Sequence, residues 1–146
     1  MTAPKLRVLF LCTGNSCRSQ MAEGWARALK SDVLDPCSAG IEAHGLNPLA
    51  VAVMAEVGID ITCHESQTVD DLPDTPIDVV VTVCDHAHES CPVLPGTPVV
   101  VHHSFVDPPR AAAGRTDDQA LEIYRSVRDA IRDFIHTLPD ALVAPH

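Results

Sequence analysis

The sequence predicts an α/β fold in which an open parallel sheet of about four strands is flanked by helices. Apolar runs typical of buried strands alternate along the chain with segments of helical period. Aromatic residues make up only 3% of the chain, so Val, Leu, Ile and Ala must fill the core, as they do in parallel sheets. The length of 146 residues suits one core, and we expect a single domain over residues 1–146.

Four segments have the composition of strands. The first, Lys5–Cys12, is rich in leucine and β-branched residues, and the second, Asp32–Ser38, is short. The third, Ile77–Cys84, has the strongest strand pattern in the chain, and Thr97–His103 is the fourth. Because helical segments separate most of these strands, we expect them to pair in parallel.

Three helices are expected between and after the strands. The first covers Ser19–Lys30, and the second covers Asn47–Val57, with an asparagine N-cap, a proline in its first turn and a glycine after its end. The third begins at Thr116 with a capping box, since Gln119 follows three residues later, and it ends before Pro139. The segment Asp107–Gly114 is predicted as a loop. The apolar face of the last helix consists of Ala120, Tyr124, Val127, Ile131, Phe134, Ile135 and Leu138.

The charge balance excludes two classes of partner. Ten basic and twenty acidic residues give a net charge of −10, which disfavours binding to nucleic acid or to an anionic membrane. The chain contains neither an apolar run of about 18 residues nor a signal-peptide pattern. We therefore expect a cytoplasmic location, and we also expect a monomer. Six cysteines in such a chain indicate catalysis, redox chemistry or metal binding.

The most informative segment lies between the first strand and the first helix. A small polar loop at this position turns backbone N–H groups inward and adds the positive end of a helix, so it suits an oxyanion. Arg18 supplies a bidentate cation, and the same positive field favours the nucleophilic thiolate form of Cys12. Ser19 is expected to donate a hydrogen bond to that thiolate. The predicted binding loop consists of Thr13, Gly14, Asn15, Ser16, Cys17 and Arg18. A buried strand-end cysteine with an unrelated surface arginine is the alternative, which the strand-to-helix position disfavours.

An aspartate in a later loop completes the predicted site. Asp107 precedes two prolines that stiffen the loop, and it follows the fourth strand. From there it is a candidate general acid that protonates the leaving oxygen of a bound oxyanion. An ordinary Asp-Pro turn is the alternative.

Two further cysteines suggest a redox pair. Cys84 closes the third strand at the sheet edge that carries the Cys12 loop, and Cys91 follows seven residues later. A second thiol beside an oxidised nucleophile can pass a disulfide along by exchange. One alternative is that both cysteines are small hydrophobic residues buried in the core. The other is a zinc site made of Cys84, His86, His88 and Cys91, although their spacing fits tetrahedral zinc poorly. We expect no metal. Cys37 and Cys63 are expected to be packing cysteines, and His44 and His64 carry no functional signal.

Four segments together carry a resemblance to a known family. Residues 12–24 (CTGNSCRSQMAEG), 38–48 (SAGIEAHGLNP), 79–95 (VVVTVCDHAHESCPVLP) and 107–109 (DPP) resemble the thioredoxin-coupled arsenate reductases. That family shares its fold with the low-molecular-weight protein tyrosine phosphatases. The resemblance extends from Arg7 to about Phe134, and the pair Cys84 and Cys91 is what distinguishes the reductases.

The resemblance implies a mechanism for arsenic detoxification. Cys12 attacks arsenate held by the loop and Arg18, and Asp107 protonates the leaving hydroxyl. Cys84 then attacks Cys12 and releases arsenite, and Cys91 attacks Cys84. Thioredoxin, or a similar dithiol such as glutaredoxin, reduces the resulting disulfide, so the external thiol is the electron donor and no cofactor is tightly bound. Cys17 shapes the loop.

Three positions differ from those of relatives that the resemblance includes. Some members bind potassium through residues that correspond to Asn15, Glu23 and Ser38 together with a threonine and an aspartate. Glu65 and Gln67 stand at the latter two positions here, so we expect no potassium. Phosphatases carry an aromatic residue after Asp-Pro, where this chain has Pro109. A low-molecular-weight phosphatase that hydrolyses phosphomonoesters is the alternative function, and a zinc- or anion-binding regulator without turnover is a third.

Overall fold

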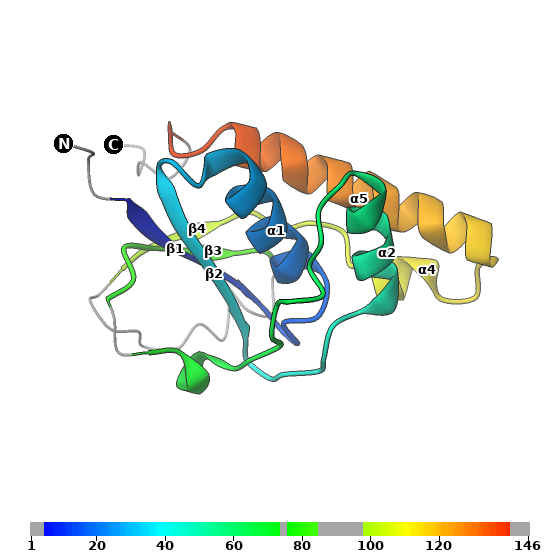
Figure 1. The fold of residues 1–146 in the computed structure, drawn as a ribbon. Coiled ribbons are helices and arrows are strands. Elements are labelled where there is room, and N and C mark those ends of the chain that lie inside the picture. The colour runs from blue at the N-terminus through cyan, green and yellow to red at the C-terminus, as the bar shows by residue number, and fades with distance from the viewer. Residues whose placement is uncertain (1–4, 74–75, 85–97, 141–146) are drawn as a thin grey trace.

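The computed structural model describes residues 5–73, 76–84 and 98–140. Four strands form one parallel sheet in the order β2-β1-β3-β4 (Figure 1). Their bounds are β1 Leu6–Cys12, β2 Leu34–Gly40, β3 Val79–Thr82 and β4 Val99–His102. The predicted fold class is therefore confirmed.

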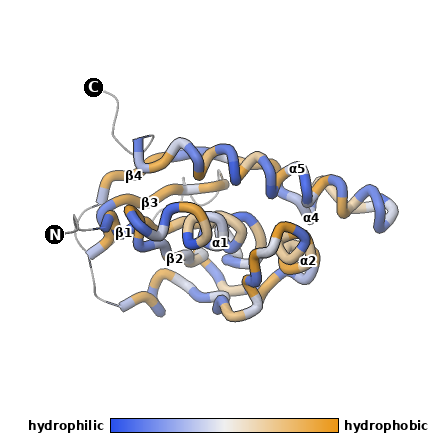
Figure 2. The backbone as a smooth tube through the Cα atoms, turned by 45° about the horizontal axis from the view of Figure 1, so that its top comes forward, coloured by the Kyte–Doolittle hydropathy of each residue, from blue (hydrophilic) through white to orange (hydrophobic). Residues whose placement is uncertain are grey.

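Three longer helices accompany this sheet. They are α1 (Arg18–Lys30), α2 (Pro48–Glu56) and α5 (Asp117–His136). Helix α1 packs on β1 and β2, and both α2 and α5 pack against α1. Figure 1 shows α5 running beside α1 and α2, and Figure 2 shows hydrophobic and hydrophilic residues alternating along α5. Two short helices, η1 (Val69–Asp71) and α4 (Pro108–Ala112), lie in the connections.

The core forms where these layers meet. The side chains of Val8, Leu9, Phe10 and Leu11 in β1 are fully buried, because β1 has a neighbouring strand on each side. Full burial of an aliphatic or aromatic side chain of this size stabilises the fold by about 1.5–3 kcal/mol. All seven residues of the apolar face predicted for the last helix are also buried.

The predicted starts of the second and third helices match the structure, whereas α1 begins one residue earlier than predicted, at Arg18. Asn47 caps α2, since its Oδ1 atom accepts hydrogen bonds from the backbone N–H groups of Leu49 at 2.9 Å and Ala50 at 3.3 Å. Thr116 and Gln119 form the expected capping box at the start of α5. These side chains satisfy N–H groups that would otherwise lack partners in the first turn.

Some element bounds were predicted wrongly. The segment expected as a loop at 107–114 contains α4, because Asp107 has an extended backbone and the two prolines after it favour a first helical turn. Strand β2 continues to Gly40, since Ala39 and Gly40 still pair with the end of β1. Strand β3 is shorter at both ends than the predicted Ile77–Cys84. Position 97 of the fourth predicted strand lies outside the described residues.

No helix in the described part of the chain combines the length and the apolar character needed to cross a membrane.

Candidate functional site

A cavity of about 270 Å³ lies at the carboxyl end of β1. Cys12 is the last residue of that strand, and the loop that follows leads directly into α1. The structure thus brings Cys12, Arg18 and Asp107 to one cavity, although they are up to 95 residues apart in the sequence. The lining residues are Cys12, Thr13, Gly14, Ser16, Cys17, Arg18, His44, Asp107 and Pro109.

Ser19 contacts the thiol of Cys12 inside the protein. The Cys12 Sγ and Ser19 Oγ atoms are 2.8 Å apart, and both residues are buried. The side-chain amide of Asn15 donates a hydrogen bond to the same Oγ atom at 2.9 Å. A thiolate only accepts hydrogen bonds, so a deprotonated Cys12 receives the Ser19 hydroxyl proton as a hydrogen bond. This arrangement stabilises negative charge on the sulfur.

Asn15 holds the loop in its shape. Its backbone φ is 47°, in the left-handed region, and its side chain is fully buried. Its Oδ1 atom accepts hydrogen bonds from the backbone N–H of Gln67 at 2.8 Å and from Nε2 of Gln20 at 3.1 Å. Asparagine adopts this backbone conformation more readily than most residues, and these bonds fix it there.

The guanidinium of Arg18 spans from the loop to the segment before α4. Its Nη1 atom donates to the backbone carbonyl of Phe105 at 3.0 Å, and its Nη2 atom lies 3.9 Å from Oδ2 of Asp107. The Arg18 side chain is only 13% exposed, whereas that of Asp107 is 42% exposed. The arginine is therefore oriented by protein contacts, and the carboxyl group beside it has access to solvent.

Cys17 lies within the loop but differs from Cys12. It is buried, and burial raises the pKa of its thiol, with the nearby Cys12 adding to the effect. A buried neutral thiol is a poor nucleophile. The structure therefore places Cys17 as part of the wall of the cavity.

Cys84 lies close to the same loop from the neighbouring strand. It follows β3 by two residues, and the backbone N–H of Val83 donates to the carbonyl of Leu11 at 2.9 Å. The Cys84 Sγ atom is 3.5 Å from Oγ1 of Thr13, the residue next to Cys12. Cys84 is 3% exposed. Its expected partner Cys91 lies outside the described residues, as do His86 and His88 of the alternative zinc site.

His44 was missed by the sequence reasoning. The segment after β2 runs along the loop of residues 13–18, for which the sequence predicts oxyanion binding and which we call the anion loop. The N–H groups of Glu42 and His44 donate to the carbonyls of Thr13 and Gly14 at 2.8 and 2.9 Å. Since β2 and β1 are parallel neighbours, the residues after both strands meet at one edge of the sheet. That pairing brings His44 to the loop, and no short motif around His44 in the sequence points to it.

A polar cluster beside the loop surrounds Glu23. The Glu23 carboxylate accepts hydrogen bonds from Nε of Arg27 at 2.9 Å and from Oγ of Ser38 at 2.6 Å, and Nε2 of His64 is 3.5 Å away. Burial lowers the pKa of His64, and the positive charge of Arg27 adds to this, while Glu23 opposes it. That no potassium binds at Glu23 and Ser38 stays a prediction. Among the described residues, no group of three or more His, Cys, Asp or Glu side chains is arranged to hold a metal ion.

Cys37 and Cys63 line a cavity of about 440 Å³ next to this cluster. Cys37 is half-buried against the core, as expected for a packing cysteine, and burial raises the pKa of its thiol to about 11. Cys63 is exposed, so its prediction as a packing residue was wrong. It lies in the turn after Asp60, with its Sγ atom 3.8 Å from the Asp60 carbonyl oxygen, rather than in a strand or helix that faces the core.

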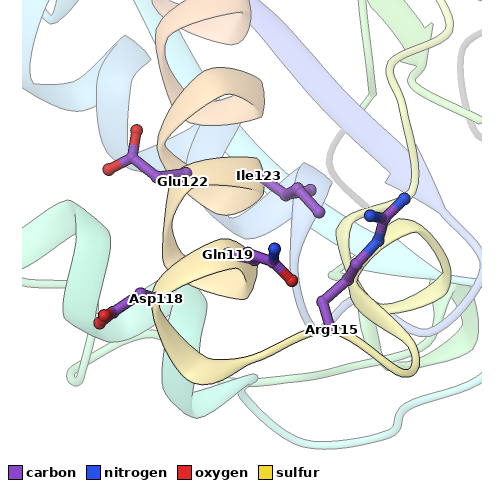
Figure 3. A pocket seen from close by; sticks show the side chains of 5 residues that line it. All are labelled: Arg115, Asp118, Gln119, Glu122 and Ile123. Carbon is purple, nitrogen blue, oxygen red and sulfur yellow. The ribbon is translucent and has the colours of Figure 1, made fainter.

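A further cavity lies at the start of α5 (Figure 3) and shares no residue with the cavity beside Cys12. Its volume is about 450 Å³, and Figure 3 shows Asp118 and Glu122 on one side of the helix and Gln119 and Ile123 on the other, where Arg115 lies. Its charged groups do not converge on one point, so it does not resemble a catalytic site.

Comparison with known sequences gives one family. The family model described as low molecular weight phosphotyrosine protein phosphatase matches residues 7–143. An arsenate reductase of Halalkalibacterium halodurans is 48% identical over 133 residues, which cover 91% of this chain and 94% of that protein. An arsenate reductase of Bacillus subtilis is 48% identical over 124 residues, covering 85% and 88% of the two chains.

Solved structures agree with this relationship. An arsenate reductase in the phosphate binding state is similar with a TM-score of 0.71 and 35% identity, over 91% of this chain and 95% of that one. An arsenate reductase in the oxidized state gives a TM-score of 0.75 and 31% identity, over 90% and 95%. A tyrosine phosphatase of Erwinia amylovora, at 18% identity with a TM-score of 0.71 over 97% and 96%, shares the fold alone.

Proposed function

The chain belongs to the low molecular weight phosphotyrosine protein phosphatase family and, within it, to the arsenate reductases, and from this premise we propose that Cys12, Cys84 and Cys91 carry the electrons that thioredoxin supplies for arsenate reduction. The substrate is arsenate, and the anion cavity beside Cys12 is where it binds. The product is arsenite, which fits a role in arsenic detoxification.

One observation favours this proposal over phosphatase chemistry alone. The Sγ atom of Cys84 lies 3.5 Å from Oγ1 of Thr13, the residue next to the nucleophile. Hydrolysis of a phosphocysteine needs a cysteine, an oxyanion loop and a general acid, but no second thiol. A buried second cysteine next to the loop that follows the nucleophile supports disulfide formation, for which the two Cα atoms must approach within about 7 Å.

The first step forms a bond between sulfur and arsenic. The N–H groups of the loop and the Arg18 guanidinium hold the negative oxygens of arsenate, and the thiolate of Cys12 attacks the arsenic atom. The bond from arsenic to a hydroxyl oxygen breaks, and Asp107 gives its proton to the leaving hydroxyl, which departs as water. Arsenic is still pentavalent in the adduct on Cys12. Arg18 and Asp107 both line this cavity, and Nη2 of Arg18 is 3.9 Å from Oδ2 of Asp107.

The second step transfers the electrons. The thiolate of Cys84 attacks the sulfur of Cys12, and a Cys12–Cys84 disulfide forms while the sulfur–arsenic bond breaks. The bonding pair leaves with arsenic, which becomes arsenite, so two electrons reduce As(V) to As(III). Cys91 then attacks Cys84, which frees Cys12 and leaves a Cys84–Cys91 disulfide. A reduced dithiol restores the three thiols.

The electron donor in this scheme is external to the chain. We assign it to thioredoxin, and a glutaredoxin-type dithiol is the alternative donor. The cycle needs no tightly bound cofactor, because the three cysteines hold the two electrons between them. A reducing compartment such as the cytoplasm keeps that donor reduced.

The decisive test follows NADPH oxidation with arsenate, thioredoxin and thioredoxin reductase. We expect turnover that depends on arsenate and on thioredoxin. The Cys12→Ser variant should give no adduct. The Cys91→Ser variant should release one arsenite per chain and stop with a Cys12–Cys84 disulfide, identified by mass spectrometry after trypsin digestion. Normal turnover of Cys91→Ser would remove Cys91 from the relay.

Phosphatase activity is the second candidate, and a specific observation favours it. The cavity holds a nucleophile, an arginine and an aspartate in the combination that phosphomonoester hydrolysis requires. Fast hydrolysis of an aryl phosphate together with no arsenate turnover would make phosphatase the main activity. A slow aryl phosphatase beside fast arsenate turnover is compatible with the reductase, since phosphate and arsenate have the same shape and charge.

A further inference from the structure

The imidazole of His44 lies at the wall of the anion cavity. His44 lines this cavity together with Cys12 and Arg18, and its side chain is 53% exposed. Its ring packs directly on the loop, because a Cβ atom added to Gly14 would be only 2.3 Å from Nδ1 of His44. A glycine at position 14 therefore leaves space for the ring edge that carries Nδ1.

Glu42 fixes which ring nitrogen carries the proton. The Nε2 atom of His44 lies 2.6 Å from Oε2 of Glu42. A carboxylate accepts but does not donate, so Nε2 is the N–H donor of the neutral ring. The Nδ1 atom is then a hydrogen-bond acceptor, and no group in the described part of the chain donates to it.

The groups to which the proposed mechanism assigns the negative oxygens of the anion have the opposite character. The loop amides and Arg18 are donors, which match the unprotonated oxygens of an oxyanion. At pH 8, arsenate and phosphate are mostly dianions that keep one hydroxyl group, whereas sulfate has none. An acceptor on the cavity wall is therefore the group that distinguishes the first two anions from the third.

We propose that Nδ1 of His44 accepts a hydrogen bond from the hydroxyl of the bound oxyanion and thereby selects arsenate and phosphate over sulfate. This inference rests on the proposed function, since it assumes that arsenate binds in this cavity. His44 is a specificity-determining residue in this role, and Glu42 acts through it by holding the tautomer. Cys12, Cys17, Arg18 and Asp107 are the other titratable groups that line the cavity, and each serves the reaction or the wall of the cavity.

The test compares three anions on the wild type and five variants at pH 8. The KM for arsenate and the inhibition constants of phosphate and sulfate are measured for the wild type, His44→Ala, His44→Asn and His44→Gln. The amide oxygen of asparagine can replace Nδ1, whereas glutamine places its amide near the position of Nε2. His136→Gln, at the exposed end of α5, is the control.

We expect His44→Ala and His44→Gln to raise the arsenate KM and the phosphate inhibition constant by about tenfold, as for loss of a hydrogen bond to a charged group. The inhibition constant of sulfate should stay the same, and kcat should change by less than about threefold. His44→Asn should recover most of the affinity, and Glu42→Ala should fall between the wild type and His44→Ala. An equal loss for phosphate and sulfate, or no loss for either, would overturn the inference.

A binding measurement separates this inference from the proposed function. Calorimetric titration of the same proteins with phosphate and sulfate needs no turnover. A wild type that does not reduce arsenate contradicts the proposed function, and the titrations still test His44. A wild type that reduces arsenate, combined with unchanged phosphate preference in His44→Ala, contradicts only the role of His44.

Discussion

The hydroxyl oxygen of Ser19 lies 2.8 Å from the sulfur of Cys12, and both residues are buried. Because the amide of Asn15 donates to the same hydroxyl oxygen, the proton of Ser19 is directed to the sulfur when Cys12 is a thiolate. The reactivity of Cys12 should therefore depend on Ser19.

The Ser19→Ala variant tests this dependence. Loss of a hydrogen bond to a charged group should slow alkylation of Cys12 by iodoacetamide at pH 7 by about tenfold. The rate is measured by mass spectrometry of the peptide that contains Cys12. Ser31→Ala, at the end of α1, is the control and should react as the wild type does. An unchanged rate in Ser19→Ala would show that the contact does not stabilise the thiolate.

The Asp107→Asn variant tests proton donation to the leaving oxygen. An amide has no acidic proton, so we expect kcat for arsenate to fall by about 10²-fold, which is a common size for general acid catalysis. The KM should change little, because Arg18 keeps its contact with the Phe105 carbonyl. Asp117→Asn, in the first turn of α5, is the matched control. A fall in affinity with an unchanged kcat would assign Asp107 to binding.

The buried His64 should make stability depend on pH. Burial lowers its pKa in the folded protein below the ordinary value of about 6.5, so the unfolded chain binds the proton more strongly. Above about pH 6.5 both states are neutral at this residue, and the free energy of unfolding should fall as the pH drops from there through the folded pKa.

Urea unfolding of His64→Gln measures this contribution. Between about pH 6.5 and pH 5 the variant should lose less of its unfolding free energy than the wild type does. His136→Gln, at the exposed end of α5, should keep the slope of the wild type. A steeper slope in His64→Gln would mean that the attraction of Glu23 outweighs burial.

Gly40 should be required for the shape of the anion loop. A Cβ atom at this position would lie 2.2 Å from the carbonyl oxygen of Glu42 and 2.7 Å from the backbone N of Asn15. Both contacts are backbone, so Gly40→Ala must move the loop, and we expect a loss of about 3 kcal/mol in stability and a weaker affinity for phosphate.

Gly114→Ala is a matched control for Gly40→Ala. Gly114 has a φ of 76° and open space where a Cβ atom would lie. The Gly114→Ala protein should therefore lose only about 1 kcal/mol of unfolding free energy through backbone strain, and its affinity for phosphate should not change. Thermal unfolding and calorimetry measure both quantities. Similar effects of the two substitutions on phosphate affinity would contradict a steric role for Gly40.

Local patterns in the sequence predicted most of the fold. The capping box at Thr116 and the periodic apolar face of α5 are set by residues close together in the chain, so the helix could be predicted well. The short helix α4 could not, because two prolines after an aspartate are equally compatible with a turn and with a first helical turn.

The candidate site could be predicted only in part. Cys12 and Arg18 belong to one continuous loop, so their spacing identified them. The contacts of Asn15 with Gln67 and of His44 with Gly14 join segments that are 30 or more residues apart, and they arise from the register of β1 with β2 and from the path of the chain after β2. That register is a property of the assembled sheet and not of any short stretch of sequence.

The left-handed backbone of Asn15 also affects the thermodynamics of substrate capture. Its conformation is held by hydrogen bonds from Gln20 and Gln67, which are present before any anion arrives. Ordering one residue costs about 1–2 kcal/mol of conformational entropy, and here that cost is met during folding. The loop is therefore already ordered when arsenate binds, and the free energy of binding is weakened very little by a cost of ordering the loop.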